Sequence, residues 1–175
     1  MMQNDPRFLL RNPAVGEIGW IIHRQAVLYA QEYGWDWTYE GLIAGISADF
    51  VARFDPAREQ AWVAEHDGKV AGSIFLMRGD EPPTAKLRLL YVEPEVRGLG
   101  LGTALVAACV ARARAVGYAS MTLWTQNVLI SARRLYQAAG FRLVAEERKW
   151  SFGHDLVGQT WQLDFAPNPD PSGPA

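Results

Sequence analysis

The sequence has a single cysteine, Cys109, and its three histidines, His23, His66 and His154, lie far apart along 175 residues. One cysteine excludes a disulfide within the chain and a zinc site built on several thiolates. The histidines do not show the His-Glu-x-x-His spacing of a metal-binding helix, so no metal cofactor is expected. The chemistry of this chain must therefore depend on other residue types.

The sequence also lacks an excess of either charge and a long apolar run. Its 17 basic and 19 acidic residues give a formal net charge of -2, which provides no general attraction for nucleic acid or an anionic membrane. No uncharged apolar stretch reaches the roughly 18 residues that span a bilayer. Asp5, Arg7 and Arg11 are unlike a signal peptide. We therefore expect a cytoplasmic protein with neither nucleic acid nor membrane as its partner, and any anion site must be local.

Length and composition fit one domain with a sizeable core. Apolar residues make up 49% of the chain and charged residues 21%, as in ordinary folded proteins, and 175 residues are too few for two comfortable domains. Residues 166–175 contain four prolines and no large apolar residue, so this tail is expected to be disordered. The prediction is a single domain over residues 1–165 followed by a disordered tail.

Hydrophobic periodicity and turn residues predict an α/β chain. Helices are predicted over residues 17–33, 38–54, 100–116 and 131–139. Strands are predicted over residues 8–11, 61–65, 70–76, 85–92, 120–125, 141–150 and 159–165, with an Asp-Gly hairpin turn between the second and third. This order describes a mixed sheet of about seven strands with helices on both faces. The first helix is predicted to bury a stripe through Trp20 and Val27, and the second a stripe through Leu42, Ile46 and Phe50.

A glycine-rich loop precedes the long third helix. It consists of Arg97, Gly98, Leu99, Gly100, Leu101, Gly102 and Thr103. Glycines let successive backbone N–H groups turn toward one point, and the helix N-terminus adds unpaired N–H groups and about half a positive charge. Arg97 and the Thr103 hydroxyl add further donors. The loop suits a pyrophosphate, although three glycines before a helix also occur in tight turns without a ligand.

Two other nucleotide-binding loops are excluded by their spacing. A P-loop requires a lysine directly after its second conserved glycine, and no lysine follows here. A dinucleotide-binding fingerprint requires a glycine at the sixth position counted from Gly98, where this chain has Thr103. The loop therefore belongs to neither class.

The stretch from Val92 to Gly102 resembles the Gln/Arg-x-x-Gly-x-Gly/Ala motif of the GNAT superfamily of N-acetyltransferases. The segment from Asn127 through Tyr136 to Phe141 resembles the second signature of that family, at the expected distance. The resemblance implies a GNAT-like, mostly antiparallel sheet that is splayed between its fourth and fifth strands. It also implies transfer of an acetyl group from acetyl-CoA to a primary amine, by direct attack in a ternary complex.

The same resemblance implies how the cofactor is held. The backbone of Leu90, Tyr91 and Val92 would pair with the pantetheine arm, and the glycine loop would bind the phosphates. Asn127 resembles a position that holds a pantetheine amide, although an Asn flanking a helix is an equal alternative.

Tyr136 is implied as the general acid, because a phenol with a pKa of about 10 stays protonated at neutral pH and can hydrogen-bond the leaving thiolate. The alternative is an aromatic side chain that simply packs on the sheet. Cys109 lies among alanines and valines, so we expect a small core residue rather than a nucleophile.

No general base is identified. Glu93, Glu65, Glu32 and Glu40 are candidates, but each such carboxylate is more often solvated or capping.

The acceptor is predicted to be a small-molecule or peptide amine, and two modes of recognition stay open. Trp35 and Trp37, between the first two helices, could hold an ammonium group. Lys86 and Arg88, which alternate along the predicted fourth strand, could instead recognise an acidic acceptor.

Residues 16–20 and 29–35 resemble a GNAT subgroup whose acetyltransferase domain often follows a MarR-type regulator. The 175 residues contain no such regulator, so no DNA-binding role is expected. A non-catalytic acyl-CoA-binding or sensor module is the alternative to an enzyme. The sequence leaves the oligomeric state open, a homodimer included.

Overall fold

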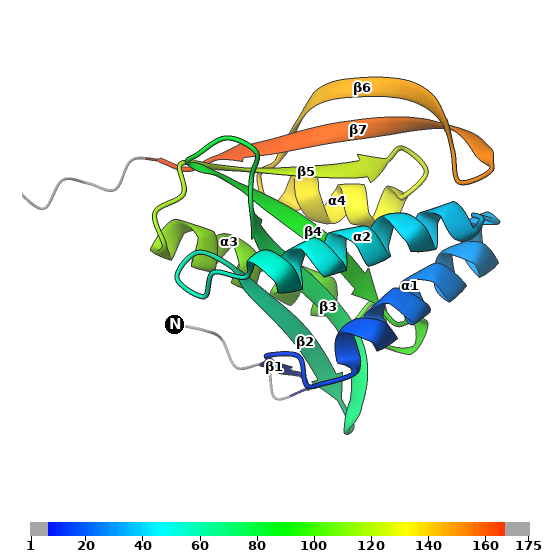
Figure 1. Cartoon of the computed structure of the whole chain (residues 1–175), viewed down its shortest axis with the longest axis horizontal. Coiled ribbons are helices and arrows are strands. Elements are labelled where there is room, and N and C mark those ends of the chain that lie inside the picture. The colour runs from blue at the N-terminus through cyan, green and yellow to red at the C-terminus, as the bar shows by residue number, and fades with distance from the viewer. Residues whose placement is uncertain (1–6, 167–175) are drawn as a thin grey trace, which may run out of the picture.

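A seven-stranded sheet with the strand order β1-β2-β3-β4-β5-β7-β6 lies at the centre of the computed structural model, which describes residues 7–166 (Figure 1). The strands are β1 (Leu9–Arg11), β2 (Gln60–His66), β3 (Lys69–Arg78), β4 (Thr84–Val92), β5 (Ser120–Gln126), β6 (Arg142–Ser151) and β7 (His154–Asp164). The helices are α1 (Glu17–Tyr33), α2 (Trp37–Arg53), α3 (Leu101–Ala115), α4 (Ile130–Ala138) and the short 3-10 helix η1 (Pro94–Val96). The predicted disordered tail lies outside the described residues, apart from Ala166.

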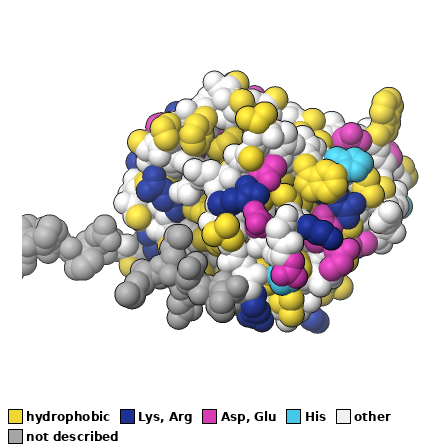
Figure 2. All heavy atoms as spheres, turned by 90° about the horizontal axis from the view of Figure 1, so that it is seen from below, with side chains coloured by type: hydrophobic (Ala, Val, Ile, Leu, Met, Phe, Trp, Pro, Cys, Tyr) yellow, Lys and Arg dark blue, Asp and Glu magenta, His cyan; other side chains and the backbone are white. Residues whose placement is uncertain are grey.

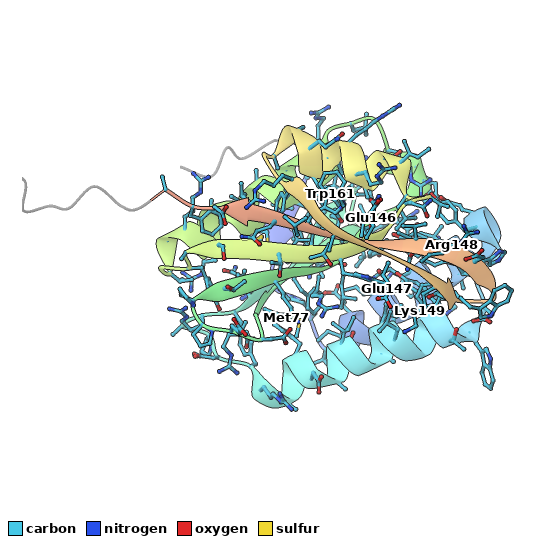
Figure 3. The ribbon with its side chains drawn as sticks, turned by 90° about the horizontal axis from the view of Figure 1, so that it is seen from above. Met77, Glu146, Glu147, Arg148, Lys149 and Trp161 are labelled. Carbon is cyan, nitrogen blue, oxygen red and sulfur yellow. The ribbon has the colours of Figure 1, made fainter. Side chains whose placement is uncertain are left out.

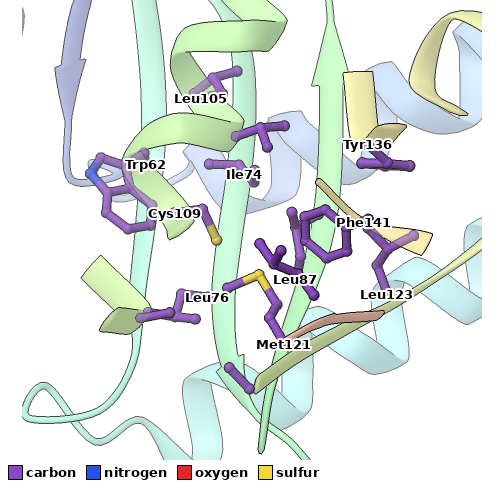
Figure 4. Packing of buried hydrophobic residues seen from close by; sticks show 14 of the residues in the cluster. Trp62, Ile74, Leu76, Leu87, Leu105, Cys109, Met121, Leu123, Tyr136 and Phe141 are labelled. Carbon is purple, nitrogen blue, oxygen red and sulfur yellow. The ribbon is translucent and has the colours of Figure 1, made fainter. Parts of the chain in front are cut away.

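Helices cover both faces of the sheet, as predicted. Ile74 and Phe75 of β3 are both fully buried but belong to different cores, because successive side chains of a strand point to opposite faces. Ile74 packs in the core beneath α3 and α4, together with Leu105 and Cys109 of α3 (Figure 4). Phe75 packs in the core beneath α1 and α2, which cover the near face of the sheet in Figure 1.

The stripe predicted for α1 is wrong by one position, and that for α2 is wrong by one position in its first turns but correct at Phe50. The buried residues of α1 are Ile21, Gln25 and Leu28, and those of α2 are Tyr39, Ile43, Ser47 and Phe50. Trp20 and Leu42, which were predicted to be buried, are 46% and 37% exposed. Each buried face contains a polar residue, Gln25 or Ser47, that interrupts the apolar repeat and moves the best apolar match to a neighbouring stripe.

The sheet splays between β4 and β5, as the GNAT resemblance implies. These two strands pair in parallel only from Thr84↔Ser120 to Lys86↔Thr122. Beyond that point β4 continues to Val92, and no strand of the described residues pairs with it on its β5 side. A β-bulge marks the same stretch, because Ser73 pairs with Tyr91 but Phe75 pairs with Arg88, and Leu89 takes a left-handed φ of 51°. A bulge re-aims the side chains of its strand, so β4 contributes to both cores around the gap.

The last strand, β7, begins at His154 rather than at the predicted residue 159. The turn before it consists of Phe152 and Gly153, both with left-handed φ. Gly158 misled the prediction because glycine usually interrupts a strand. Here it makes room for Trp124 of β5, since a Cβ at Gly158 would lie 2.9 Å from the indole nitrogen.

The edge strand β6 is exposed along nearly its whole length and arches over β7 (Figure 1). Figure 3 shows its charged stretch from Glu146 to Lys149, with Trp161 of β7 beside it. Gln159 connects the two strands, since it donates a hydrogen bond to Glu146 Oε1 at 2.7 Å and accepts one from the Trp161 indole at 3.2 Å. Polar side chains therefore anchor this exposed strand to the sheet.

On the face shown in Figure 2, basic and acidic side chains are interspersed rather than grouped by sign. Within residues 7–166, none of the helices has both the length and the apolar character that crossing a membrane requires.

Candidate active site

Two adjoining cavities lie where β4 and β5 part. The larger has a volume of about 430 Å³ and the smaller about 80 Å³. They share five lining residues, Gln25, Tyr29, Leu90, Leu129 and Ala132. These residues come from α1, from β4 and from the start of α4 with the residue before it, so the two cavities adjoin at the gap in the sheet.

The glycine loop forms one wall of the larger cavity. Of the residues predicted to bind the cofactor, nine line it: Leu90, Tyr91, Val92, Arg97, Gly98, Gly100, Leu101, Gly102 and Thr103. The structure thus brings the free edge of β4 and the start of α3 to one space. Leu99 is not among the lining residues, and its side chain is 36% exposed.

The geometry of this wall fits an oxyanion. Gly98 and Gly100 have φ of 80° and 87°, and a Cβ on either would meet nothing within 4 Å. Glycine is therefore required there by the left-handed backbone and not by lack of space. Gly100 is the N-cap of α3 and supplies no side-chain cap, so the first N–H groups of the helix remain available for an anion such as a phosphate.

Gly102 has a different role. A Cβ at this position would lie 2.7 Å from Leu135 Cδ1, so the glycine lets the first turn of α3 approach α4. Leu129, Ser131, Ala132 and Leu135, from the start of α4 and the residue before it, then line the cavity opposite the loop. These four residues were not predicted from the sequence. Their position in the sequence could have indicated a role, because α4 is the helix that follows β5, one of the two strands that part at the splay.

Arg97 is engaged by a carboxylate across the mouth of the larger cavity. Its Nη2 lies 2.5 Å from Oε1 of Glu32, which is on α1 and lines the same cavity. The side chains of Arg97 and Glu32 are 46% and 29% exposed, so water weakens the attraction. A phosphate bound at the loop would compete with Glu32 for this guanidinium.

Aromatic side chains line the smaller cavity. Trp35 is only 5% exposed and packs against Tyr29, Tyr39 and Phe152, with ring centroids 4.8–5.2 Å apart. Phe152 comes from the β6–β7 turn, far away in sequence. The other tryptophan proposed for the acceptor, Trp37, is 83% exposed and does not line this cavity.

Tyr136 of α4 also lines the smaller cavity and is 5% exposed. Its ring packs near Phe141, with centroids 6.0 Å apart (Figure 4). Burial raises the pKa of its phenol above the ordinary value of 10.0, so the hydroxyl is protonated at neutral pH. Within residues 7–166 this hydroxyl has no hydrogen-bond partner, which leaves it available to donate to a ligand.

Asn127 does not line either cavity. Its side-chain oxygen accepts a hydrogen bond from the Val157 N–H at 3.2 Å, and its own N–H donates to the Val157 carbonyl at 2.9 Å. Arg133 Nη1 donates to its carbonyl at 3.0 Å. Asn127 therefore fixes the end of β5 against β7 and the start of α4.

None of the four carboxylates considered as general base lines the smaller cavity, although Glu32 lines the larger one. Glu93 forms a two-bond ion pair with Arg24 at 2.7 and 2.8 Å. Glu65 pairs with Arg11 at 2.9 Å, Glu32 is held by Arg97, and Glu40 lines neither cavity. Among the described residues, no Asp or Glu lines the smaller cavity.

Cys109 is fully buried in the α3–α4 core (Figure 4), where burial raises the pKa of its thiol. It is a core residue, as predicted, and the raised pKa disfavours the thiolate that a nucleophile needs. Across the part of the chain that the structure describes, the His, Cys, Asp and Glu side chains form no group that could hold a metal ion.

Comparisons with known proteins agree with this geometry. A model of the acetyltransferase (GNAT) family matches residues 23–141. An uncharacterized N-acetyltransferase of Schizosaccharomyces pombe is 33% identical over 115 residues, which cover 65% of this chain and 70% of that protein. Human N-acetyltransferase 8B is 40% identical over 85 residues, which cover 46% of this chain but only 37% of that protein.

Among solved structures, a putative acetyltransferase from Salmonella typhimurium with its cofactor acetyl-CoA superposes with a TM-score of 0.74. The match covers 94% of this chain and 98% of that one at 20% sequence identity. At this level of identity the similarity establishes the fold.

Proposed function

The chain belongs to the GNAT family of acetyltransferases, and we propose that it transfers the acetyl group of acetyl-CoA to a primary amine by direct attack in a ternary complex. One observation carries the proposal: the anion-binding loop and an aromatic-lined cavity meet at the gap between β4 and β5. This arrangement allows two substrates to approach each other from opposite faces of the sheet.

Acetyl-CoA supplies the activated thioester. The loop from Arg97 to Thr103 would hold its pyrophosphate, with Leu99 contributing only backbone. The exposed edge of β4 at Leu90, Tyr91 and Val92 offers backbone hydrogen bonds to the pantetheine arm, because no strand pairs with it there. We assign Asn127 to holding the end of β5 in place, since its side chain is bonded to β7.

Tyr136 would act as the general acid. As the new N–C bond forms and the C–S bond breaks, its hydroxyl gives a proton to the thiolate, the nitrogen loses one to water, and water restores the phenol. The amine must attack in its neutral form. Burial among aromatic side chains disfavours ammonium, and no carboxylate of the described chain lines the smaller cavity to stabilise it.

Measuring acetyl-CoA binding beside CoA release with a panel of amines tests the proposal. We expect binding by calorimetry and release of the CoA thiol with at least one class of amine. Binding without turnover of any amine would instead support the non-catalytic acyl-CoA-binding or sensor module. Absence of acetyl-CoA binding would contradict both.

Two finer assignments accompany the proposal. We place the protein in the cytoplasm and in the subgroup often linked to MarR-type regulators. The two segments that resemble this subgroup, residues 16–20 and 29–35, lie at the two ends of α1. The second of them contributes Tyr29, Tyr33 and Trp35 to the walls of the cavities.

A further inference from the structure

Arg88 is the one charged side chain, among the described residues, that lines the smaller cavity. It is half-buried on β4. Lys86, two positions earlier on the same strand, pairs with Asp80 at 2.7 Å. Within residues 7–166, Arg88 has no carboxylate within ion-pair distance. Of these two neighbouring cations on β4, Lys86 has a counter-ion among the described residues and Arg88 has none.

Partial burial removes water from the Arg88 guanidinium, and no ion pair within the described chain compensates for this loss of hydration. Loss of hydration lowers the pKa of its guanidinium. Arg88 also borders a surface groove whose acidic lining residues are Asp49, Asp55, Glu59 and Asp80, none of which forms an ion pair with it. Asp80 favours the charge only from a distance and is bound to Lys86. A half-buried guanidinium without an ion-pair partner is stabilised most by an anion that enters the cavity and binds it.

Two further polar groups in the same lining lack a partner. Gln25 and Gln126 are each only 2% exposed. Gln25 Nε2 and Gln126 Oε1 have no hydrogen-bond partner within the described chain. The Tyr39 hydroxyl donates to Gln25 Oε1 at 3.2 Å, which turns the amide so that its N–H groups stay free. The lining therefore offers one unused donor and one unused acceptor, which buried polar groups rarely leave unpaired.

This set of groups discriminates between acceptor classes. A polyamine or another purely cationic amine would meet Arg88 with no carboxylate to balance it. A purely apolar amine could donate to Gln126 Oε1 but would leave the guanidinium and Gln25 Nε2 without an acceptor. An amine that carries a carboxylate satisfies all three, because the carboxylate can accept from Arg88 and from Gln25 Nε2 while the nitrogen donates to Gln126 Oε1.

We propose that the acceptor is an amino acid or similar small amine bearing a carboxylate, which Arg88 binds while Gln25 and Gln126 hydrogen-bond the remainder. This inference rests on the proposed acetyl transfer and names its substrate class. The small volume of the cavity, about 80 Å³, admits a small amino acid or the amine-bearing end of a larger one. The aromatic wall then contacts the apolar part of the acceptor, and Arg88 fixes its orientation.

The test compares matched acceptors. Glycine, alanine, aspartate and phenylalanine are each assayed beside the corresponding α-carboxamide, with CoA release as the readout at saturating acetyl-CoA. We expect kcat/KM, expressed per neutral amine, to be about 10- to 100-fold higher for at least one acid than for its amide, the range for a hydrogen bond to a charged group. Arg88→Gln should abolish that preference, and Arg88→Lys should retain part of it. Lys86→Gln is the matched control on the same strand and should retain all of it.

Equal kcat/KM for acids and amides, or a preference that survives in Arg88→Gln, would overturn the inference and leave acetyl transfer standing. If acetyl-CoA binds but neither acids nor amides are acetylated, the proposed function fails. Binding of the N-acetylated acids and amides, measured with CoA present, then decides the inference separately. Binding of the N-acetylated acids but not of the amides supports the inference. Equal binding of both, or binding of neither, overturns it.

Discussion

At the scale of single residues, the glycines around α3 show how one residue type serves different purposes. Gly98 and Gly100 adopt left-handed conformations beside open space, whereas Gly102 is helical and makes room for Leu135. The first two shape the backbone of the proposed anion site. The third sets the distance between two helices. A substitution at each should therefore fail for a different reason.

We expect Gly100→Glu to lower the affinity for acetyl-CoA about tenfold or more, because it places a negative charge beside the phosphate site. Gly117→Glu is a matched control. Gly117 lies at the other end of α3, has a φ of 88°, and also has nothing within 4 Å of a Cβ. Both variants should lose about 1 kcal/mol of unfolding free energy through left-handed strain. Calorimetry should show weaker binding only for the first, and equal affinity in both variants would contradict the loop assignment.

Tyr136→Phe should reduce kcat by about 100-fold, as expected for loss of a general acid, with little change in acetyl-CoA affinity. The fold should tolerate the change, since the hydroxyl has no hydrogen-bond partner in the described structure. Tyr118→Phe is the contrasting variant, because it removes a hydrogen bond to the Arg58 carbonyl at 3.1 Å, away from both cavities. It should cost about 1 kcal/mol of stability and leave kcat unchanged. An unaltered rate in Tyr136→Phe would remove the acid role.

At the scale of secondary-structure elements, α1 connects the two substrate regions. Gln25 and Tyr29 line both cavities, Glu32 reaches the glycine loop, and Arg24 pairs with Glu93 at the end of β4. The helix thus contacts the proposed donor site and the proposed acceptor site within a few turns. A small movement of α1 would therefore change the geometry of both proposed sites.

Glu32→Gln should strengthen acetyl-CoA binding about two- to fivefold at low salt, the range expected for a partly exposed ion pair. The carboxylate holds Arg97 at 2.5 Å and would repel a phosphate in the same cavity. Glu40→Gln makes the same change of charge at an exposed position outside the cavities. Titrations at low and high ionic strength check the effect, which salt should suppress. Weaker binding in Glu32→Gln would show that Glu32 orients Arg97 for the ligand instead.

At the scale of the whole molecule, Arg11 joins segments that are distant along the chain. Its guanidinium donates two hydrogen bonds to Glu17 at the start of α1, both at 2.8 Å. It donates another to Glu65 of β2 at 2.9 Å. A single side chain therefore fastens β1 and α1 to the sheet, and the network should contribute to stability in a pH-dependent way.

The bond from Arg11 lowers the pKa of Glu17 below its ordinary value of 4.5. A carboxyl with a lowered pKa in the folded state stabilises the fold at higher pH and loses that contribution as the pH falls through the folded pKa. Arg11→Met should therefore cost about 1 kcal/mol at pH 7 and less at pH 3. Urea unfolding between these pH values measures the difference. Arg53→Met, whose side chain makes no ion pair among residues 7–166, should give a small difference that does not vary with pH.

Much of the fold was predictable because its signals are local. The helix over residues 17–33 was predicted with the bounds it has, and the Asp67-Gly68 hairpin turn has left-handed φ at both residues. The errors arose where a distant side chain decided the outcome. Trp124 allows Gly158 to lie inside a strand, and the buried Gln25 concealed the inner face of α1.

In the candidate site, too, some features could be predicted from the sequence and others depended on tertiary packing. The glycines between Arg97 and Thr103 led to the prediction of an anion-binding loop, with a tight turn as the alternative, because left-handed backbone and the start of a helix are local properties that the sequence can indicate. Lys86 and Arg88 could not be told apart in the sequence. Only tertiary packing paired Lys86 with Asp80 and left Arg88 beside the aromatic cavity with no ion-pair partner in the described part of the chain. Burial and pairing depend on residues far along the chain, so they follow from the folded arrangement alone.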